Sequence, residues 1–142
     1  MVSRKVLKKL RLELPIADDM EIAAAEAATS IGESVAMSQD KLDEVRMALI
    51  EACINAFEHS HAEDGKVYVT FAVLGEVEPT ALRITVQDFG HGFDASAVVR
   101  PSPPGSGGRK RGHGLTLIRG LMDEVDIRSG GAGTTVVMSK VL

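Results

Sequence analysis

An aspartate and two alternating glycines, Asp88-x-Gly90-x-Gly92, directly follow an apolar, alternating run of residues. At the end of a strand such a carboxylate can project toward a hydrogen-bond donor of a ligand, and glycine lets the backbone approach that ligand closely. An exocyclic amine, such as that of adenine, is a suitable donor. The same residues also suit an ordinary tight turn, so the pattern alone is weak evidence for a site.

A second glycine pattern, Gly112-His113-Gly114, runs into an apolar segment with helical spacing. The free backbone N–H groups at a helix start, together with the helix dipole, favour the binding of phosphate. Basic residues just before this start, including Arg111, add positive charge there. A capped helix after a flexible loop explains the glycines equally well. The spacing matches neither the Walker-type phosphate loop nor the dinucleotide-binding fingerprint, which disfavours both classes.

A third candidate is the pair Glu51 and Asn55 in the segment EACINAFEH. Residues four positions apart share one face of a helix. The helical wheel predicts that this face lies beside the apolar stripe and not within it. Such a pair is usually solvated helix surface, and asparagine within a helix is only mildly unfavourable.

Hydrophobic periodicity predicts the elements that must position these residues. Strands are expected over 6–14, 67–73, 81–87, 125–128 and 134–141, and helices from Asp18 or Asp19 to about 36, from Ser38 or Asp40 to about 59, and over 115–122. A glycine- and proline-rich loop of about two dozen residues interrupts this order, which is long for a compact domain without a purpose. The order predicts an α/β (α+β) fold, a two-layer sandwich of a mostly antiparallel mixed sheet with the helices on one face.

The composition limits the class of protein. A length of 142 residues fits one domain, 1–142, and the net charge of −4 argues against a general nucleic-acid binder. The lone Cys53 excludes an internal disulfide and suits a reducing compartment. The chain shows no apolar run near the ~18 residues of a membrane helix and no signal peptide, so we expect no membrane partner and a cytoplasmic location.

Charge is uneven along the chain. Residues 12–64 contain only Lys41 and Arg46 as basic residues among many acidic ones. A solvated acidic helix face is the simpler interpretation, and a docking surface for a basic partner is the alternative.

In their order and context, the three motifs resemble those of the GHKL ATPases, the group of gyrase, the MutL repair protein, histidine kinases and heat-shock chaperones. The helix with Asn55 corresponds to the Asn box, Asp88-x-Gly90 to the first glycine box, and Gly114-Leu115 to the second. The resemblance covers nearly the whole chain and implies the histidine-kinase-type ATPase fold. Further segments are similar to the anti-sigma-factor serine kinases of the RsbW and SpoIIAB type, namely Glu51-Ala-x-x-Asn55-Ala-x-x-His59, Gly92-Phe93-Asp94, Leu121-Met-Asp-Glu-Val125 and Gly133-Thr-Thr-Val.

The resemblance implies an ATP and Mg²⁺ site. Asn55 would coordinate Mg²⁺ through its side-chain oxygen, and Glu51 would be the general base that orients the attacking hydroxyl. Asp88 would accept the adenine amino group, with Thr134 beside the ring. The remaining candidates are the glycines of the two boxes and their neighbours: Gly90, Gly92, Arg111, Gly112, His113, Gly114 and Leu115. His59 would either line the nucleotide site or cap the end of its helix, and His91 and His113 are better explained as loop surface than as ligand contacts.

The implied function is that of an ATP-dependent serine kinase that is also an anti-sigma factor. Such a protein binds a sigma factor, or phosphorylates a STAS-type anti-anti-sigma partner, and the family implies a homodimer. The segment between Asp94 and Gly112 would be the ATP lid, but none of its cations aligns with a catalytic arginine, so ATP binding is better supported than kinase activity. A non-catalytic ATP-binding module and a detached histidine-kinase-like catalytic domain remain alternatives, whereas a DNA-topology or repair ATPase would need further transducing domains.

Overall fold

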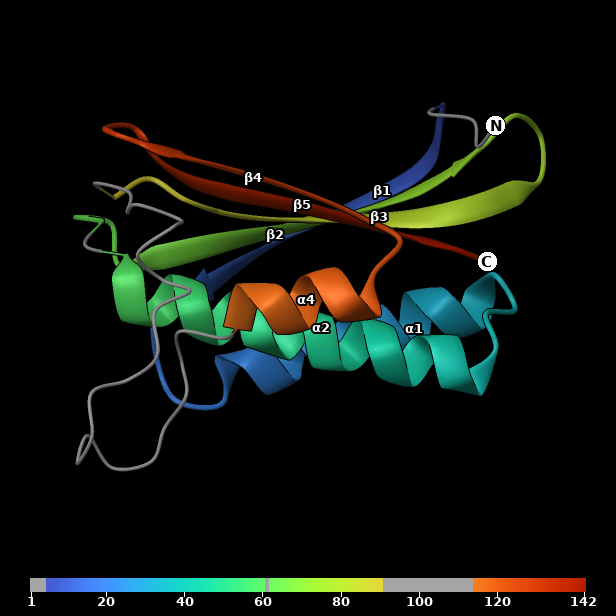
Figure 1. Cartoon of the computed structure of the whole chain (residues 1–142), viewed down its shortest axis with the longest axis horizontal. Helices are drawn as coiled ribbons and strands as arrows, with labels where there is room; N and C mark the ends of the chain where they lie inside the picture. Colours follow the sequence, from blue (N-terminus) through green and yellow to red (C-terminus); the bar gives the residue numbers. More distant parts are fainter. Residues whose placement is uncertain (1–4, 61, 91–113) are drawn as a thin grey trace.

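One face of an antiparallel sheet carries all the helices in the computed structural model, which describes residues 5–60, 62–90 and 114–142 (Figure 1). Within these residues the sheet has five strands in the order β1-β2-β3-β5-β4. The elements are β1 (Val6–Pro15), α1 (Met20–Ser34), α2 (Gln39–His59), β2 (Lys66–Gly75), β3 (Pro79–Asp88), α4 (Gly114–Leu121), β4 (Glu124–Gly130) and β5 (Gly133–Val141). For the described residues, the predicted order of helices and strands and the two-layer arrangement are therefore confirmed.

The register of the sheet explains which side chains are buried. Successive residues of a strand point to opposite faces, so one set of alternate positions faces the helices. In the central strands this set includes the pairs Val69–Val86 and Phe71–Ile84, all four of which are buried. Met138 of β5 continues the same layer opposite Ile84. These side chains and the apolar faces of the helices form one hydrophobic core.

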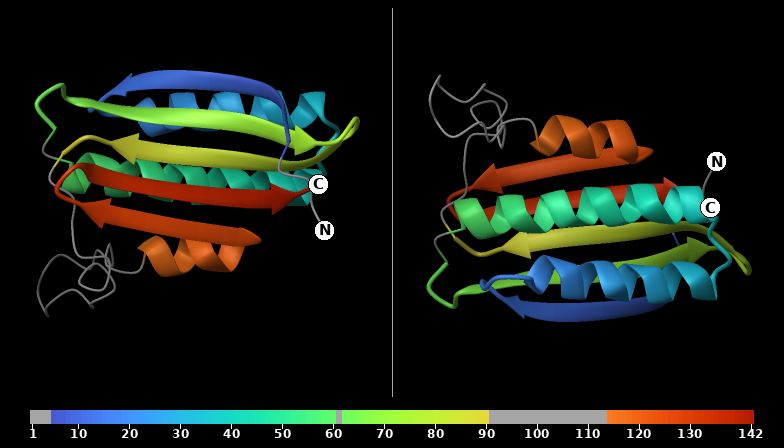
Figure 2. Two further views of the ribbon diagram at one scale, coloured as in Figure 1. Left: turned by 90° about the horizontal axis from the view of Figure 1, so that it is seen from above. Right: turned by 90° about the horizontal axis from the view of Figure 1, so that it is seen from below.

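Helix α2 is the central helix of the helical layer and lies between α1 and α4 (Figure 2). Its start is capped by Ser38, whose hydroxyl oxygen accepts a hydrogen bond from the Lys41 N–H at 3.3 Å. Its buried apolar residues recur at helical spacing and face both the sheet and the neighbouring helices: Leu42, Val45, Ala48, Leu49, Ala52, Cys53 and Ala56. The predicted helix is confirmed, and of the two predicted starts, Ser38 and Asp40, the structure has Ser38 at the N-cap.

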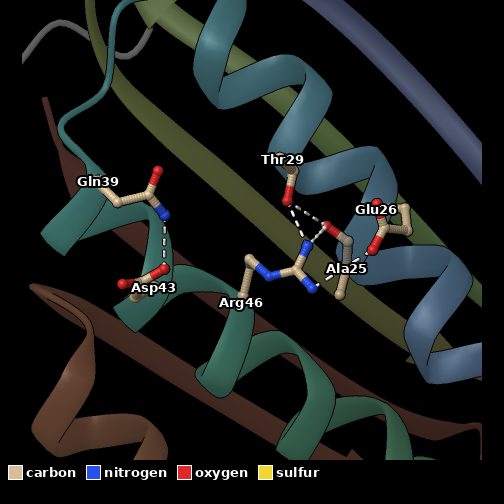
Figure 3. A network of polar contacts seen from close by, with 6 residues as sticks. All are labelled: Ala25, Glu26, Thr29, Gln39, Asp43 and Arg46. Carbon is tan, nitrogen blue, oxygen red and sulfur yellow. Dashed lines mark hydrogen bonds and ion pairs between the residues drawn. The ribbon is translucent and has the colours of Figure 1, made fainter.

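Arg46 connects α2 to α1 through the network in Figure 3. Its guanidinium donates to the backbone carbonyl of Ala25 at 3.0 Å and to the hydroxyl of Thr29. The Thr29 hydroxyl itself donates to the same carbonyl at 3.1 Å. A longer contact of 3.5 Å joins Arg46 to the exposed carboxylate of Glu26. The network fixes how the two helices lie against each other, next to small residues that let them pack closely.

Lys140 holds the other side of the helical layer. Its side chain is buried near the end of β5, where Nζ donates to the Leu121 carbonyl oxygen at 2.6 Å and to a Glu44 carboxylate oxygen at 2.9 Å. The first bond satisfies a carbonyl at the C-terminal end of α4, and the second reaches α2. Lys140 therefore ties α4 to α2 and to the sheet.

Element ends differ slightly from the predictions. Helix α1 ends at Ser34 and not at 36, since Ala36 adopts a left-handed conformation with φ of 58°. Asp19 is at the N-cap of α1, but its side chain makes no capping hydrogen bond. The sheet is antiparallel at every pairing among the described residues, where a mostly antiparallel mixed sheet was expected. No helix in the described part of the chain is long and apolar enough to cross a membrane.

Candidate functional site

The three motifs meet toward one end of the molecule. Strand β3 ends at Asp88, α4 begins at Gly114, and the C-terminal half of α2 runs toward the same end (Figure 2). The hairpin between β4 and β5 also turns at this end. The fold thus brings together segments that lie far apart in the sequence.

Asp88 is a buried carboxylate with one hydrogen-bond donor, the Gly90 N–H, among the described residues. It is 3% exposed, and its Oδ1 accepts the backbone N–H of Gly90 at 2.9 Å. Among the residues that the structure describes, no donor lies within hydrogen-bond distance of Oδ2. Burying a carboxylate oxygen is costly unless a donor meets it, so an oxygen that meets none within the described part of the chain is suited to a ligand that brings one.

Thr134 lies directly opposite Asp88 in the pairing of β3 with β5. Its side chain is buried, and its hydroxyl shares a hydrogen bond of 2.9 Å with the hydroxyl of Ser129. Because directly opposed residues of an antiparallel pair point to the same face of a sheet, the Thr134 side chain and the Asp88 carboxylate share one face. The sequence did not single out Ser129, because a serine beside glycines in a hairpin is an ordinary turn residue.

Asn55 is 2% exposed, so the prediction that its face lies beside the apolar stripe is wrong for this residue. The sheet and two flanking helices surround α2, and the buried part of this helix is therefore wider than a single stripe. No hydrogen bond joins the Asn55 carboxamide to another side chain or carbonyl in the described ranges. A buried amide of this kind has an oxygen available for a hard cation or for a ligand donor.

Glu51 meets the start of α4. A methyl group added at Gly114 would lie 3.1 Å from Oε2 of Glu51, so the glycine leaves room for the carboxylate beside the first turn of α4. The next residue, Leu115, is buried in the core and fixes this turn against α2. Glu51 itself is half-buried, one helical turn before Asn55.

Cys53 lies on the same helix but faces the core. Burial, and to a lesser degree the negative charge of Glu21, raises the pKa of its thiol from 9.0 to about 12. The thiolate is the reactive form of cysteine, so this side chain is chemically inert at neutral pH.

Several predicted site residues lie outside the described residues. They are Gly92, Arg111, Gly112 and His113, together with the lid over 94–112. His59 is the last residue of α2 and is half-buried, and both of its predicted roles stay predictions. Within the described ranges, no group of three or more His, Cys, Asp or Glu side chains could hold a metal ion.

Comparison with known sequences gives a family for this arrangement. Residues 17–140 match the model of the histidine kinase-like ATPase domain. The chain is 30% identical over 122 residues to the serine-protein kinase RsbW of Bacillus subtilis (strain 168), an alignment that covers 80% of this chain and 73% of the relative. It is 33% identical over 113 residues to RsbW of Bacillus pumilus (strain SAFR-032), covering 72% of this chain and 67% of the relative.

Solved structures share the fold at lower identity. The RsbU and RsbW domains of Rv1364c from Mycobacterium tuberculosis superpose with a TM-score of 0.70 at 19% identity, covering 94% of this chain. This chain spans only 32% of that longer chain. The histidine kinase domain of the blue-light activated kinase of Erythrobacter litoralis EL346 gives a TM-score of 0.52 at 20% identity, covering 89% of this chain and 60% of the other.

Proposed function

Since the chain belongs to the histidine kinase-like (GHKL) ATPase family, and within it to the anti-sigma-factor serine kinases of the RsbW type, we propose that it transfers the γ-phosphoryl group of ATP to a serine of a partner protein. The observation that carries the proposal is the pair of buried polar side chains, Asp88 and Asn55, at the end of the molecule where α4 begins, with hydrogen-bonding atoms that meet no partner among the described residues.

Asp88 and Thr134 would recognise the nucleobase. The 6-amino group of adenine is a donor, and it would complete the hydrogen bonds of the buried Asp88 carboxylate. The Thr134 hydroxyl, opposite Asp88 in the sheet, can both donate and accept, and so would contact the ring edge. This arrangement favours a base with a donor at position 6 over a base with a carbonyl oxygen there.

Asn55 would hold the magnesium ion of Mg-ATP. Its buried amide oxygen is a hard ligand, and Mg²⁺ usually takes one or two protein ligands while phosphates and water supply the others. The bound ion would neutralise charge on the phosphate oxygens. The first turn of α4, beginning at Gly114, would offer backbone N–H groups to the phosphates.

Glu51 would act as the general base. In the proposed transfer, the serine oxygen of the partner forms a bond to the γ-phosphorus, the bond between that phosphorus and the bridging oxygen of ADP breaks, and the serine proton passes to the Glu51 carboxylate. The position of Glu51 beside the first turn of α4 supports this role, because phosphate at that turn would lie next to the carboxylate.

The partners that we propose are a sigma factor and a STAS-domain anti-anti-sigma factor, with the chain acting as a cytoplasmic homodimer. Exposed carboxylates on α1 and α2 support an acidic docking surface, namely Glu26, Glu33, Asp40 and Asp43. A phosphoserine carries a charge of about −1.5 to −2 and would be repelled by such a surface. Phosphorylation would thus release the STAS protein and leave the kinase free to bind sigma.

ATP binding tests the nucleotide site directly. By calorimetry with and without Mg²⁺, we expect micromolar binding to the wild-type protein, weakened about tenfold or more by Asp88→Asn because the amide no longer offers two acceptors. Asn55→Ala should remove the Mg²⁺ dependence of binding. Asp126→Asn, which removes an exposed carboxylate on β4, is the matched control and should bind ATP normally. Absence of ATP binding to the wild type under both conditions would rule out the proposal.

Replacement of Glu51 separates a kinase from an ATP-binding module without catalysis. Glu51→Gln should retain ATP affinity and lower phosphate transfer to a STAS-domain acceptor by roughly 10²- to 10⁴-fold, the usual contribution of a general base. Glu58→Gln, on an exposed position of the same helix, should transfer phosphate at the wild-type rate. Normal transfer by Glu51→Gln would remove Glu51 from the reaction.

A further inference from the structure

Gly133, the first residue of β5, adopts a backbone conformation that residues with a side chain rarely adopt. Its φ is +117°, in the region that glycine occupies freely and other residues rarely adopt. It stands opposite Gly130 at the closed end of the β4–β5 hairpin. In the sequence Gly133 is one of several glycines in a turn and begins the segment Gly133-Thr-Thr-Val that resembles the kinase family, but neither observation predicts its backbone conformation.

The backbone that follows β3 crosses close to Gly133. A Cβ at Gly133 would lie 2.9 Å from the carbonyl carbon of Asp88 and 2.9 Å from the Cα of Phe89, and closer still to the Asp88 carbonyl oxygen. All three atoms belong to the main chain, so no flexible side chain can move aside. A side chain at this position would therefore push β5 and the end of β3 apart.

The residues on either side of this contact are those of the proposed nucleobase site. Thr134 follows Gly133 directly and pairs with Asp88. The Asp88 carboxylate is held by the N–H of Gly90, two residues further along the same backbone. A shift of about an ångström at Gly133 would change the distance between the Thr134 hydroxyl and the Asp88 carboxylate, and such a shift is large for a recognition site.

We propose that Gly133 is a positioning residue for nucleobase recognition: its missing side chain and positive φ hold β5 against the Asp88 carbonyl and so keep the Asp88 carboxylate and the Thr134 hydroxyl in one fixed arrangement. This inference rests on the proposed function, in which Asp88 accepts the amino group of adenine. Gly133 touches no ligand and acts through Asp88 and Thr134.

The test compares ATP with ITP, whose hypoxanthine base carries a carbonyl oxygen where adenine carries the amino group. Both affinities are measured on the same protein, so partial unfolding lowers them together and leaves their ratio unchanged. The wild type should bind ATP more tightly than ITP. Gly133→Ala should lower this ratio by about tenfold or more, the scale of losing a hydrogen bond to a charged group. If the alanine variant unfolds in buffer alone, both affinities are measured for it and for the wild type in a stabilising osmolyte such as trimethylamine N-oxide, which favours the folded state of both proteins.

Two glycines provide matched controls. Gly131 lies in the same hairpin, and an added Cβ there meets nothing within 4 Å. Gly65 has a φ of +64° with open space around it, so Gly65→Ala introduces backbone strain without crowding. Both variants should keep the wild-type ratio, although Gly65→Ala should unfold at a lower temperature.

A second measurement distinguishes positioning through Asp88 from a general effect. In an Asp88→Ala background no hydrogen-bonding side chain remains at this position, and Gly133→Ala should then leave the ATP-to-ITP ratio unaltered. An equal loss in both backgrounds, or an unchanged ratio in Gly133→Ala itself, would overturn the inference while leaving ATP binding intact. A wild type that binds no ATP would instead remove the proposed function and this inference with it.

Discussion

At the scale of single residues, the site depends on two glycines whose missing side chains leave room for neighbouring groups. Gly114 leaves space for the Glu51 carboxylate at the start of α4, and Gly133 leaves space for the backbone at Asp88. The neighbouring groups differ: Gly114 faces the end of the Glu51 side chain, whereas Gly133 faces main-chain atoms of Asp88 and Phe89. A substitution at Gly114 is therefore expected to shift one carboxylate without moving a strand.

Gly114→Ala tests this expectation. A Cβ 3.1 Å from Oε2 of Glu51 would displace the carboxylate by a few tenths of an ångström, and we expect phosphate transfer to slow by about tenfold. Gly120→Ala is the control on the same helix, since nothing lies within 4 Å of its added Cβ. It should keep the wild-type rate and raise the free energy of unfolding by roughly 0.5–1 kcal/mol, because alanine is the better helix former. Equal rates for both variants would contradict the proposed role of Glu51 as the general base.

At the scale of elements, the helical layer is held by two polar connections on either side of α2. Arg46 bonds to α1, and Lys140 bonds to the end of α4 and to Glu44. Both cations are largely or partly buried, and both donate to backbone carbonyl oxygens. They fix the helices laterally, while the apolar core supplies most of the stabilisation.

The Arg46 network gives a prediction for stability. Arg46→Met keeps much of the aliphatic stem but loses the bonds to Ala25 and Thr29, and we expect the free energy of unfolding to fall by about 1–3 kcal/mol. Glu26→Gln loses only a 3.5 Å contact with a carboxylate that is 67% exposed, so a change below about 0.5 kcal/mol is expected. Urea unfolding of the three proteins measures both differences. A larger effect of Glu26→Gln would mean that the ion pair, and not the carbonyl bond, holds the helices.

At the scale of the whole molecule, one core extends from the sheet through α2 to both outer helices. Cys53 is in the middle of this core and is fully buried. Its ionisation is therefore linked to the global folding equilibrium, because the thiolate is favoured only when the chain unfolds.

The alkaline stability of the protein should reflect this linkage. Burial raises the pKa of the Cys53 thiol in the folded protein from 9.0 to about 12. The contribution of the buried neutral thiol to the free energy of unfolding is therefore fully present below pH 9 and is lost as the pH rises from 9 toward 12. Between pH 8 and pH 10, the wild type should lose about 1 kcal/mol more of its free energy of unfolding than Cys53→Ala does. Urea unfolding of both proteins at the two pH values gives this difference. Equal losses would show that Cys53 is exposed to solvent in the folded protein.

The sequence by itself determined where the helices and strands lie along the chain and which side chains are available for the site. Periodicities of two and of 3.6 residues are local properties, so both hairpins, the helix starting after Ser38 and the order of elements could be predicted. The motifs around Asn55, Asp88 and Gly114 could be recognised for the same reason, because each is a short, contiguous pattern. How the two hairpins join, with β5 placed between β3 and β4, was not predicted.

Only the tertiary structure decided which of these groups are buried and which ones meet. The helical wheel predicted a single apolar stripe on α2, with Asn55 beside it. In the structure, neighbours on several sides of α2 bury Asn55 as well. The pairing of Asp88 with Thr134 depends on the register of β3 with β5. The close approach of Gly133 to the Asp88 backbone depends on the same register. The meeting of Glu51 with Gly114 depends on the packing of α4 against α2. Such contacts join residues distant in sequence, and they are set by the packing of the whole core rather than by any local pattern.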